Sequence, residues 1–117
     1  MHKSLIALAA ATALVAPAAA QAPLIFRCDQ QGAAVYYRIG PGEFSNWSGA
    51  GRGNSAGWRN NQCRMHGIAC VWINGVLGAS SRDFHSAFDT NTGLYRYGPR
   101  DTDPNTTLQC TRSALPE

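Results

Sequence analysis

Hydrophobic and polar positions alternate along this chain in short runs, and these runs are separated by residues typical of turns. After residue 21 no segment has a sustained 3.6-residue apolar period, and short aromatic or β-branched runs lie between clusters of Gly, Asn, Asp and Pro. This pattern is typical of short strands joined by turns. It predicts an all-β domain, an antiparallel meander of about seven or eight strands that forms a small barrel or a sandwich.

The expected strands follow from this alternation. The strongest local signal is Asn74-Gly75 between two apolar runs, because a type I′ turn needs positive φ at both central residues. The Gly-rich segment 49–57 is predicted to be a loop, since it has too little side-chain mass to pack. Around these signals, the predicted strands cover 24–28, 33–39, 43–47, 58–63, 68–73, the run after Asn74-Gly75, 83–89, 94–97 and 106–112.

The N-terminus has the pattern of an export signal. Lys3 precedes an Ala-rich apolar stretch that ends Ala18-Ala19-Ala20, which gives a charged region, an apolar region and an A-x-A cleavage site. We therefore expect residues 1–20 to be a signal peptide and 21–117 to be a single β domain, with 113–117 as a frayed tail. Such a protein is periplasmic or secreted and has no stable membrane insertion after signal cleavage.

The composition of the expected mature chain limits the classes of partner. Lys3 is the only lysine, so nine arginines stand against seven carboxylates and give a net charge of +2. That balance is too small and too scattered to indicate nucleic acid or an anionic membrane surface. The lysine-free, Arg- and Ala-rich composition indicates a bacterial source. A domain of about 97 residues has a modest core and benefits from covalent staples.

The four cysteines, Cys28, Cys63, Cys70 and Cys110, are expected to supply those staples. An even number of cysteines in an exported chain indicates two disulfides, although three pairings are possible. We favour Cys28–Cys110 with Cys63–Cys70. The first would tie the opening strand of the meander to the closing one, and the second would clip a short Gly-containing excursion.

A metal site or a small hydrolase is an alternative use of these residues. His66 lies between Cys63 and Cys70, and His85 is a candidate fourth zinc ligand. Asp83 beside His85 on one strand face is a fragment of acid–base machinery. The spacing matches no common zinc pattern, exported thiols oxidise, and no nucleophile has a recognisable setting. We therefore expect no catalytic residue, no metal and no cofactor.

Two tryptophans flank the Gly-rich loop. Trp47 precedes it and Trp58 follows it, with Arg52 and Arg59 close by. Such rings can stack on sugars or receive a partner protein, and the arginines can hold anionic groups. The alternative is that both rings cover the core at strand ends. We take these four residues as the candidate surface of a non-enzymatic binding module, with a glycan or an exported protein as the partner.

A set of turn, cysteine and aromatic positions recurs in a known class of protein. The set is Trp58-Arg-Asn60-Asn-Gln-Cys63, Cys70, Asp89-x-x-Thr92-Gly93-x-Tyr95 and Cys110. In these positions the chain resembles a loose class of small exported, cysteine-containing β proteins of proteobacteria that have no assigned function. The resemblance covers most of the expected mature domain and implies a β fold with no catalytic activity.

A remote likeness concerns Ser48-Gly49-Ala50-Gly51-Arg52. This run is similar to the Ser-Gly-Ala-Arg/Lys-Tyr loop that MliC-type periplasmic inhibitors, small eight-stranded barrels, insert into the cleft of c-type lysozyme. The extra Gly51 and the missing tyrosine after Arg52 depart from that loop. The likeness implies an inhibitor of a cell-wall hydrolase such as lysozyme as the alternative function, with Ser48 and Arg52 as contact residues.

Overall fold

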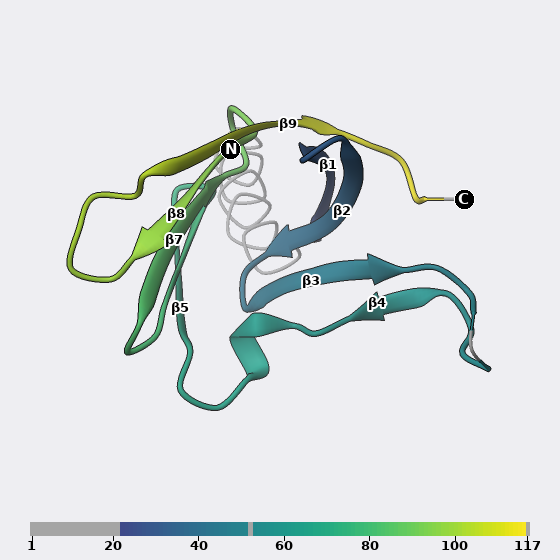
Figure 1. Ribbon diagram of the computed structural model, residues 1–117, viewed down its shortest axis with the longest axis horizontal. Coiled ribbons are helices and arrows are strands. Elements are labelled where there is room, and N and C mark those ends of the chain that lie inside the picture. Colours follow the sequence, from purple (N-terminus) through teal and green to yellow (C-terminus); the bar gives the residue numbers. More distant parts are fainter. Residues whose placement is uncertain (1–21, 52, 117) are drawn as a thin grey trace, which may run out of the picture.

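The computed structural model describes residues 22–51 and 53–116, which build one curled antiparallel sheet (Figure 1). The predicted signal peptide, residues 1–20, and the predicted binding residue Arg52 lie outside the described residues. Across the described ranges, no helix is long and apolar enough to cross a membrane. The predicted all-β antiparallel fold is confirmed, and its form is an open half-barrel.

The described residues form nine strands and one short 3-10 helix. Their spatial order is β4-β3-β2-β1-β9-β8-β7-β6-β5, so two meanders are joined where the first strand pairs with the last, and β4 and β5 are the edges. The elements are β1 (Leu24–Gln30), β2 (Ala33–Gly40), β3 (Glu43–Ser48), β4 (Gly57–Arg59), η2 (Gln62–Arg64), β5 (Ala69–Ile73), β6 (Val76–Ser80), β7 (Phe84–Asp89), β8 (Leu94–Pro99) and β9 (Thr106–Arg112).

The turns between the strands follow the local chemistry of the sequence. Asn74 and Gly75 have φ angles of 52° and 82°, which confirms the type I′ hairpin predicted between β5 and β6. The predicted strand 58–63, in contrast, ends early. Asn60 has a φ of 56°, a left-handed conformation that interrupts the extended backbone, and Cys63 lies in η2.

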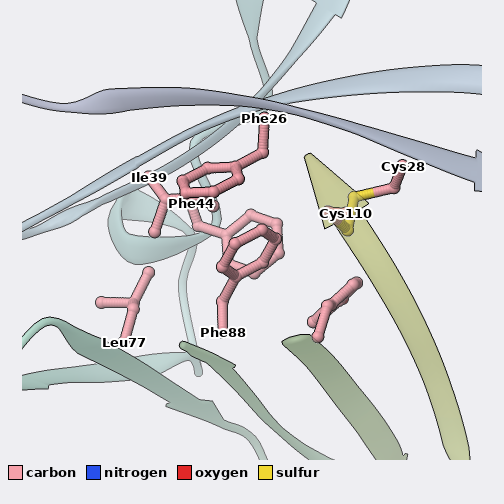
Figure 2. Packing of buried hydrophobic residues seen from close by; sticks show 8 residues of the cluster. Phe26, Cys28, Ile39, Phe44, Leu77, Phe88 and Cys110 are labelled. Atoms are coloured by element: carbon pink, nitrogen blue, oxygen red, sulfur yellow. A yellow bond between two sulfur atoms is a disulfide. The ribbon is translucent and has the colours of Figure 1, made fainter. Parts of the chain in front are cut away.

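The core lies on the inner face of the curled sheet, where strands of both meanders place large side chains opposite one another (Figure 2). The ring of Phe26 on β1 lies 4.9 Å from that of Phe88 on β7, and the ring of Phe44 on β3 lies 5.4 Å from that of Tyr95 on β8. These contacts hold the two meanders together across the concave side. The largest fully buried side chains are Phe26, Phe44, Phe88, Ile39, Leu77 and Cys28.

Both predicted disulfides are confirmed. Cys28 and Cys110 pair across β1 and β9 with a Cα–Cα distance of 4.4 Å, beside the buried rings (Figure 2). Cys63 and Cys70 join η2 to β5 with a Cα–Cα distance of 5.4 Å. The first bridge fixes the seam between the meanders, and the second lies in the segment that connects the two sheet edges. Two disulfides indicate an oxidising compartment outside the cytoplasm.

Candidate binding sites

Trp47 and Trp58 form a pair on the outer face of the sheet. They lie opposite each other in the register of β3 and β4, with ring centroids 5.1 Å apart and planes at 69°. Phe44 points into the core, so strand alternation directs Trp47 to the opposite face. Both tryptophan rings are half-buried. The structure therefore brings two of the four predicted binding residues into direct contact, away from the inner core.

Arg38 on β2 joins this pair and was not among the predicted site residues. Its guanidinium carbon lies 5.2 Å from the centroid of the Trp58 ring, within the range of a cation–π contact. Its Nε also forms an ion pair with Glu43 Oε2 at 2.5 Å, and the Ser45 hydroxyl donates to the same oxygen at 2.9 Å. The Glu43 carboxylate is therefore neutralised locally, and the guanidinium is held against the tryptophan.

A cleft of about 480 Å³ opens beside this cluster, and we call it the outer cleft. Arg38, Arg59 and Arg64 bring three guanidinium groups to it, whereas Glu43 is the only carboxylate among the described residues that line it. The guanidinium of Arg59 donates to the backbone oxygen of Ser55, which ties it to the hairpin loop. The predicted residues Trp58 and Arg59 both line this cleft. Its remaining walls are Pro41, Gly42, Ser45, Asn60 and Asn61.

Asn61 fixes the floor of the outer cleft relative to β3. Its Oδ1 accepts hydrogen bonds from the backbone N–H groups of Phe44 at 2.9 Å and Cys63 at 3.1 Å, and its Nδ2 donates to the carbonyl oxygen of Gly42 at 3.2 Å. As the N-cap of η2 it satisfies a donor that the short helix leaves open. Arg64 lies on the same short helix, so these hydrogen bonds of Asn61 also fix the position of its backbone.

A second hollow, the inner pocket, lies between the two meanders and has a volume of about 420 Å³. Three carboxamides line one side of it. Asn60 Nδ2 donates to Asn46 Oδ1 at 3.2 Å, which couples two of them. Gln62 Oε1 is buried and has no hydrogen-bond partner among the described residues. An acceptor in that state destabilises the fold by about 1–3 kcal/mol, so it stands out as a site for a donor.

The rest of the lining of the inner pocket is mainly aromatic and aliphatic. Phe84, Tyr95 and Tyr97 contribute rings, the last two with centroids 4.9 Å apart, and Met65 and Ile68 contribute aliphatic side chains. Burial raises the pKa of Tyr95, and repulsion from the neighbouring tyrosines adds to that shift. The Tyr95 hydroxyl therefore stays neutral at physiological pH. Among the residues that the structure describes, no charged side chain lines this pocket, in contrast to the outer cleft.

The residues of the metal and hydrolase alternative do not assemble into one site. Cys63 and Cys70 are bonded to each other, so neither is available as a thiolate. His66 is exposed, and Asp83 is an exposed partner of Arg82 at 3.5 Å. Within residues 22–51 and 53–116, no group of three or more His, Cys, Asp and Glu side chains is placed to hold a metal ion. His85 has a buried, unpartnered Nε2, which the structure leaves unexplained.

The Gly-rich segment continues the β3–β4 hairpin beyond its named strands. Gly51 and Asn54 exchange two backbone hydrogen bonds, of 3.0 and 2.8 Å, and form an isolated bridge. In Figure 1 this hairpin extends away from the rest of the sheet. The segment expected to be a loop is therefore a projecting, partly paired hairpin end, with Trp47 and Trp58 at its base.

No protein-family model, curated protein or solved structure matches this chain. The ligand class of each hollow is therefore inferred from the residues that line it. One is arginine-rich and bordered by paired tryptophans, and the other is neutral and lined by carboxamides and rings.

Proposed function

We propose that this protein is an exported, non-enzymatic binding module of the bacterial envelope that holds an anionic saccharide in the outer cleft. The convergence of Arg59 and Arg64, which have no carboxylate partner among the described residues, on a cleft beside the Trp47–Trp58 pair carries the proposal. The oxidised cysteines and the predicted signal peptide support a periplasmic or secreted location.

The chemistry of the outer cleft fits a sugar that carries carboxylate groups. A guanidinium presents paired N–H donors that match the two oxygens of a carboxylate, and the flat apolar face of a sugar ring stacks on an aromatic side chain. Arg38 and Glu43 neutralise each other, so the excess positive charge of the outer cleft comes from Arg59 and Arg64. A cleft of this volume also suits a sugar ring better than it suits the flat surface of a partner protein.

Fluorescence titration with a charged and a neutral trisaccharide tests this function. Trigalacturonate is expected to shift the tryptophan emission and to saturate, whereas maltotriose is expected to leave it unchanged. Arg64→Ala should weaken trigalacturonate binding about tenfold or more, since one charge-assisted hydrogen bond contributes about 1.5–3 kcal/mol. Arg64 is the best choice because no described hydrogen bond or ion pair of the folded chain depends on its side chain.

Arg96→Ala is the matched control. Arg96 is exposed on β8, lies outside both hollows, and has no ion pair with another described residue, so the substitution removes the same charge without touching the cleft. Its trigalacturonate affinity should stay within about twofold of wild type, the size of a weak surface electrostatic effect. Equal losses in the two variants would reduce the binding to a net-charge effect and refute the site, as would no response to trigalacturonate.

The projecting hairpin favours a second candidate function, inhibition of a cell-wall hydrolase such as lysozyme. The Gly51–Asn54 bridge stiffens an exposed end that carries Ser48 at its base, which suits insertion into an enzyme cleft. A turbidity assay with c-type lysozyme and bacterial cells tests it. Slower clearing at micromolar protein would support inhibition, and unchanged clearing would exclude it for that enzyme.

A further inference from the structure

We propose that the inner pocket is a second binding site, which takes a small neutral ligand carrying an amide group. It is distinct from the outer cleft and does not depend on the function proposed for that cleft. The two hollows share only Asn60 among their lining residues. Their chemistries are opposite, because one presents cations and the other presents carboxamides and rings.

The neutral lining of the inner pocket excludes a charged ligand. Transfer of an ion from water into a site without a counter-charge carries a large desolvation penalty. The described walls offer only carboxamides, tyrosine hydroxyls and backbone as polar partners. Tyr95 cannot supply a negative charge to a cation, because burial raises its pKa and keeps its hydroxyl protonated. A neutral ligand is therefore the class that fits.

The carboxamides point specifically to an amide. The bond from Asn60 Nδ2 to Asn46 Oδ1 leaves Asn46 Nδ2 as a donor and Asn60 Oδ1 as an acceptor, neither of which has another described hydrogen bond. A ligand amide offers the complementary C=O and N–H. Gln62 also lines the pocket, and its buried Oε1 lacks a donor among the described residues. Its carboxamide must turn toward the pocket to accept a ligand N–H or O–H.

The apolar side of the pocket suits the carbon skeleton next to such an amide. Met65 and Ile68 provide aliphatic surface, and Phe84, Tyr95 and Tyr97 provide aromatic rings. An acetamido methyl group or a short acyl chain can pack there without loss of hydrogen bonds. The volume of about 420 Å³ falls in the usual range for small-molecule sites. An N-acetylated sugar and an N-acylated amino acid amide share this chemistry.

Nuclear magnetic resonance of the ¹⁵N-labelled, disulfide-bonded protein tests the site with three probes. N-acetylglucosamine and N-acetyl-leucinamide carry the amide, and glucose lacks it. At least one amide probe is expected to shift the side-chain NH₂ signals of Asn46, Asn60 and Gln62 in a saturable way, and glucose is not. The probe that shifts them identifies an amino sugar or an acylated peptide as the source. No shift with either amide probe, or an equal shift with glucose, would overturn the proposal.

Gln62→Leu separates binding from folding. It replaces the carboxamide, with its unpartnered oxygen, by an apolar side chain of similar size. The urea midpoint should therefore stay the same or rise while the affinity for the amide probe falls about tenfold. Asn60→Gly is a second variant, since glycine adopts the observed φ of 56° without strain. It should also lose affinity for the amide probe.

Two control variants complete the test of the inner pocket. Asn54→Ala removes a carboxamide at the hairpin end, and Arg64→Ala removes a guanidinium from the outer cleft, so both should keep wild-type affinity for the amide probe. Retained binding in Gln62→Leu, or equal loss in Asn54→Ala, would refute the site. Because Arg64→Ala is expected to weaken only trigalacturonate binding, failure of one site is distinguishable from failure of the other.

Discussion

The side-chain oxygen of Asn61 accepts a hydrogen bond from the backbone N–H of Phe44 at 2.9 Å. Phe44 belongs to the buried core, and Asn61 caps the short helix η2, so the bond links the core to the segment between the sheet edges. Neighbours of Asn61 face in opposite directions, with Gln62 in the inner pocket and Arg64 in the outer cleft. One carboxamide therefore positions walls of both sites.

Asn61→Ala should lower the free energy of unfolding by about 1–3 kcal/mol, because it leaves a backbone donor of the core strand without a partner and removes the cap of η2. Asn61→Asp keeps an acceptor for Phe44 and Cys63 and loses only the donor to Gly42, so its loss should be smaller. Urea unfolding of both variants measures this order. A loss in Asn61→Asp as large as that in Asn61→Ala would mean that the bond to Gly42 dominates.

Local chemistry in the sequence was sufficient for the turn at Asn74-Gly75. These two residues can adopt successive left-handed conformations at low energy, so the hairpin is readable from them alone. The disulfide pairing was favoured among three possibilities, Cys28–Cys110 because the first and last strands of a closing meander are neighbours, and Cys63–Cys70 because the excursion between them is short. Arg38 could have been found in the same way. The two-residue turn at Pro41-Gly42 places it opposite Ser45, on the face that Trp47 shares.

The inner pocket could not be predicted from local patterns. Its walls come from β3, η2, β7 and β8, which are distant in sequence, and they meet only because the sheet curls through its accumulated twist. The break at Asn60 was equally hidden, since Trp58-Arg59 begins as a strand and asparagine tolerates both extended and left-handed backbone. Gln62 therefore was expected on a strand and lies instead on a capped helical turn.

The two disulfides should differ in their contribution to stability. Loop-closure entropy assigns about 4.5 kcal/mol to the bridge that spans 82 residues and about 2.4 kcal/mol to the one that spans 7. Cys28 and Cys110 are also almost fully buried, so their replacement leaves a cavity beside the core rings. The Cys28→Ala/Cys110→Ala pair should therefore lose more than the Cys63→Ala/Cys70→Ala pair in urea unfolding. Equal losses would contradict the entropic account.

Gly93 should tolerate no side chain. A Cβ at this position would lie 2.2 Å from the backbone oxygen of Cys110, and the residue has a φ of 80°. The neighbouring strand cannot move away, because Cys110 N–H donates to the Gly93 oxygen at 2.8 Å and its sulfur is bonded to Cys28. Gly93→Ala should lower the free energy of unfolding by about 3 kcal/mol or more, through steric overlap added to left-handed strain.

Gly42→Ala is the matched control for Gly93→Ala. Gly42 has a similar φ of 73°, but nothing lies within 4 Å of a Cβ built there. Its substitution carries only the backbone strain, about 1–2 kcal/mol. Thermal or urea unfolding of the two variants separates overlap from strain, and a difference of less than about 1 kcal/mol would show that the β9 backbone yields to the new side chain.

Alkaline pH should unfold this protein through its buried tyrosines. Burial raises the pKa of Tyr95 and, less strongly, that of Tyr37, whereas both ionise near pH 10 in the unfolded chain. Above about pH 10 the folded state therefore binds more protons than the unfolded state. The free energy of unfolding falls as the pH rises further, until these hydroxyls ionise in the folded chain.

Tyr95→Phe keeps the ring that contacts Phe44 and Phe88 but removes the hydroxyl group whose ionisation couples folding to pH. The pH midpoint of alkaline unfolding should rise in this variant, and it should rise more than in Tyr37→Phe, because the pKa of Tyr95 is shifted further. Circular dichroism followed with tyrosinate absorbance measures unfolding and ionisation together. An unchanged midpoint in Tyr95→Phe would show that the folded chain ionises this hydroxyl without a penalty, and that the wall of the inner pocket is wetter than its burial indicates.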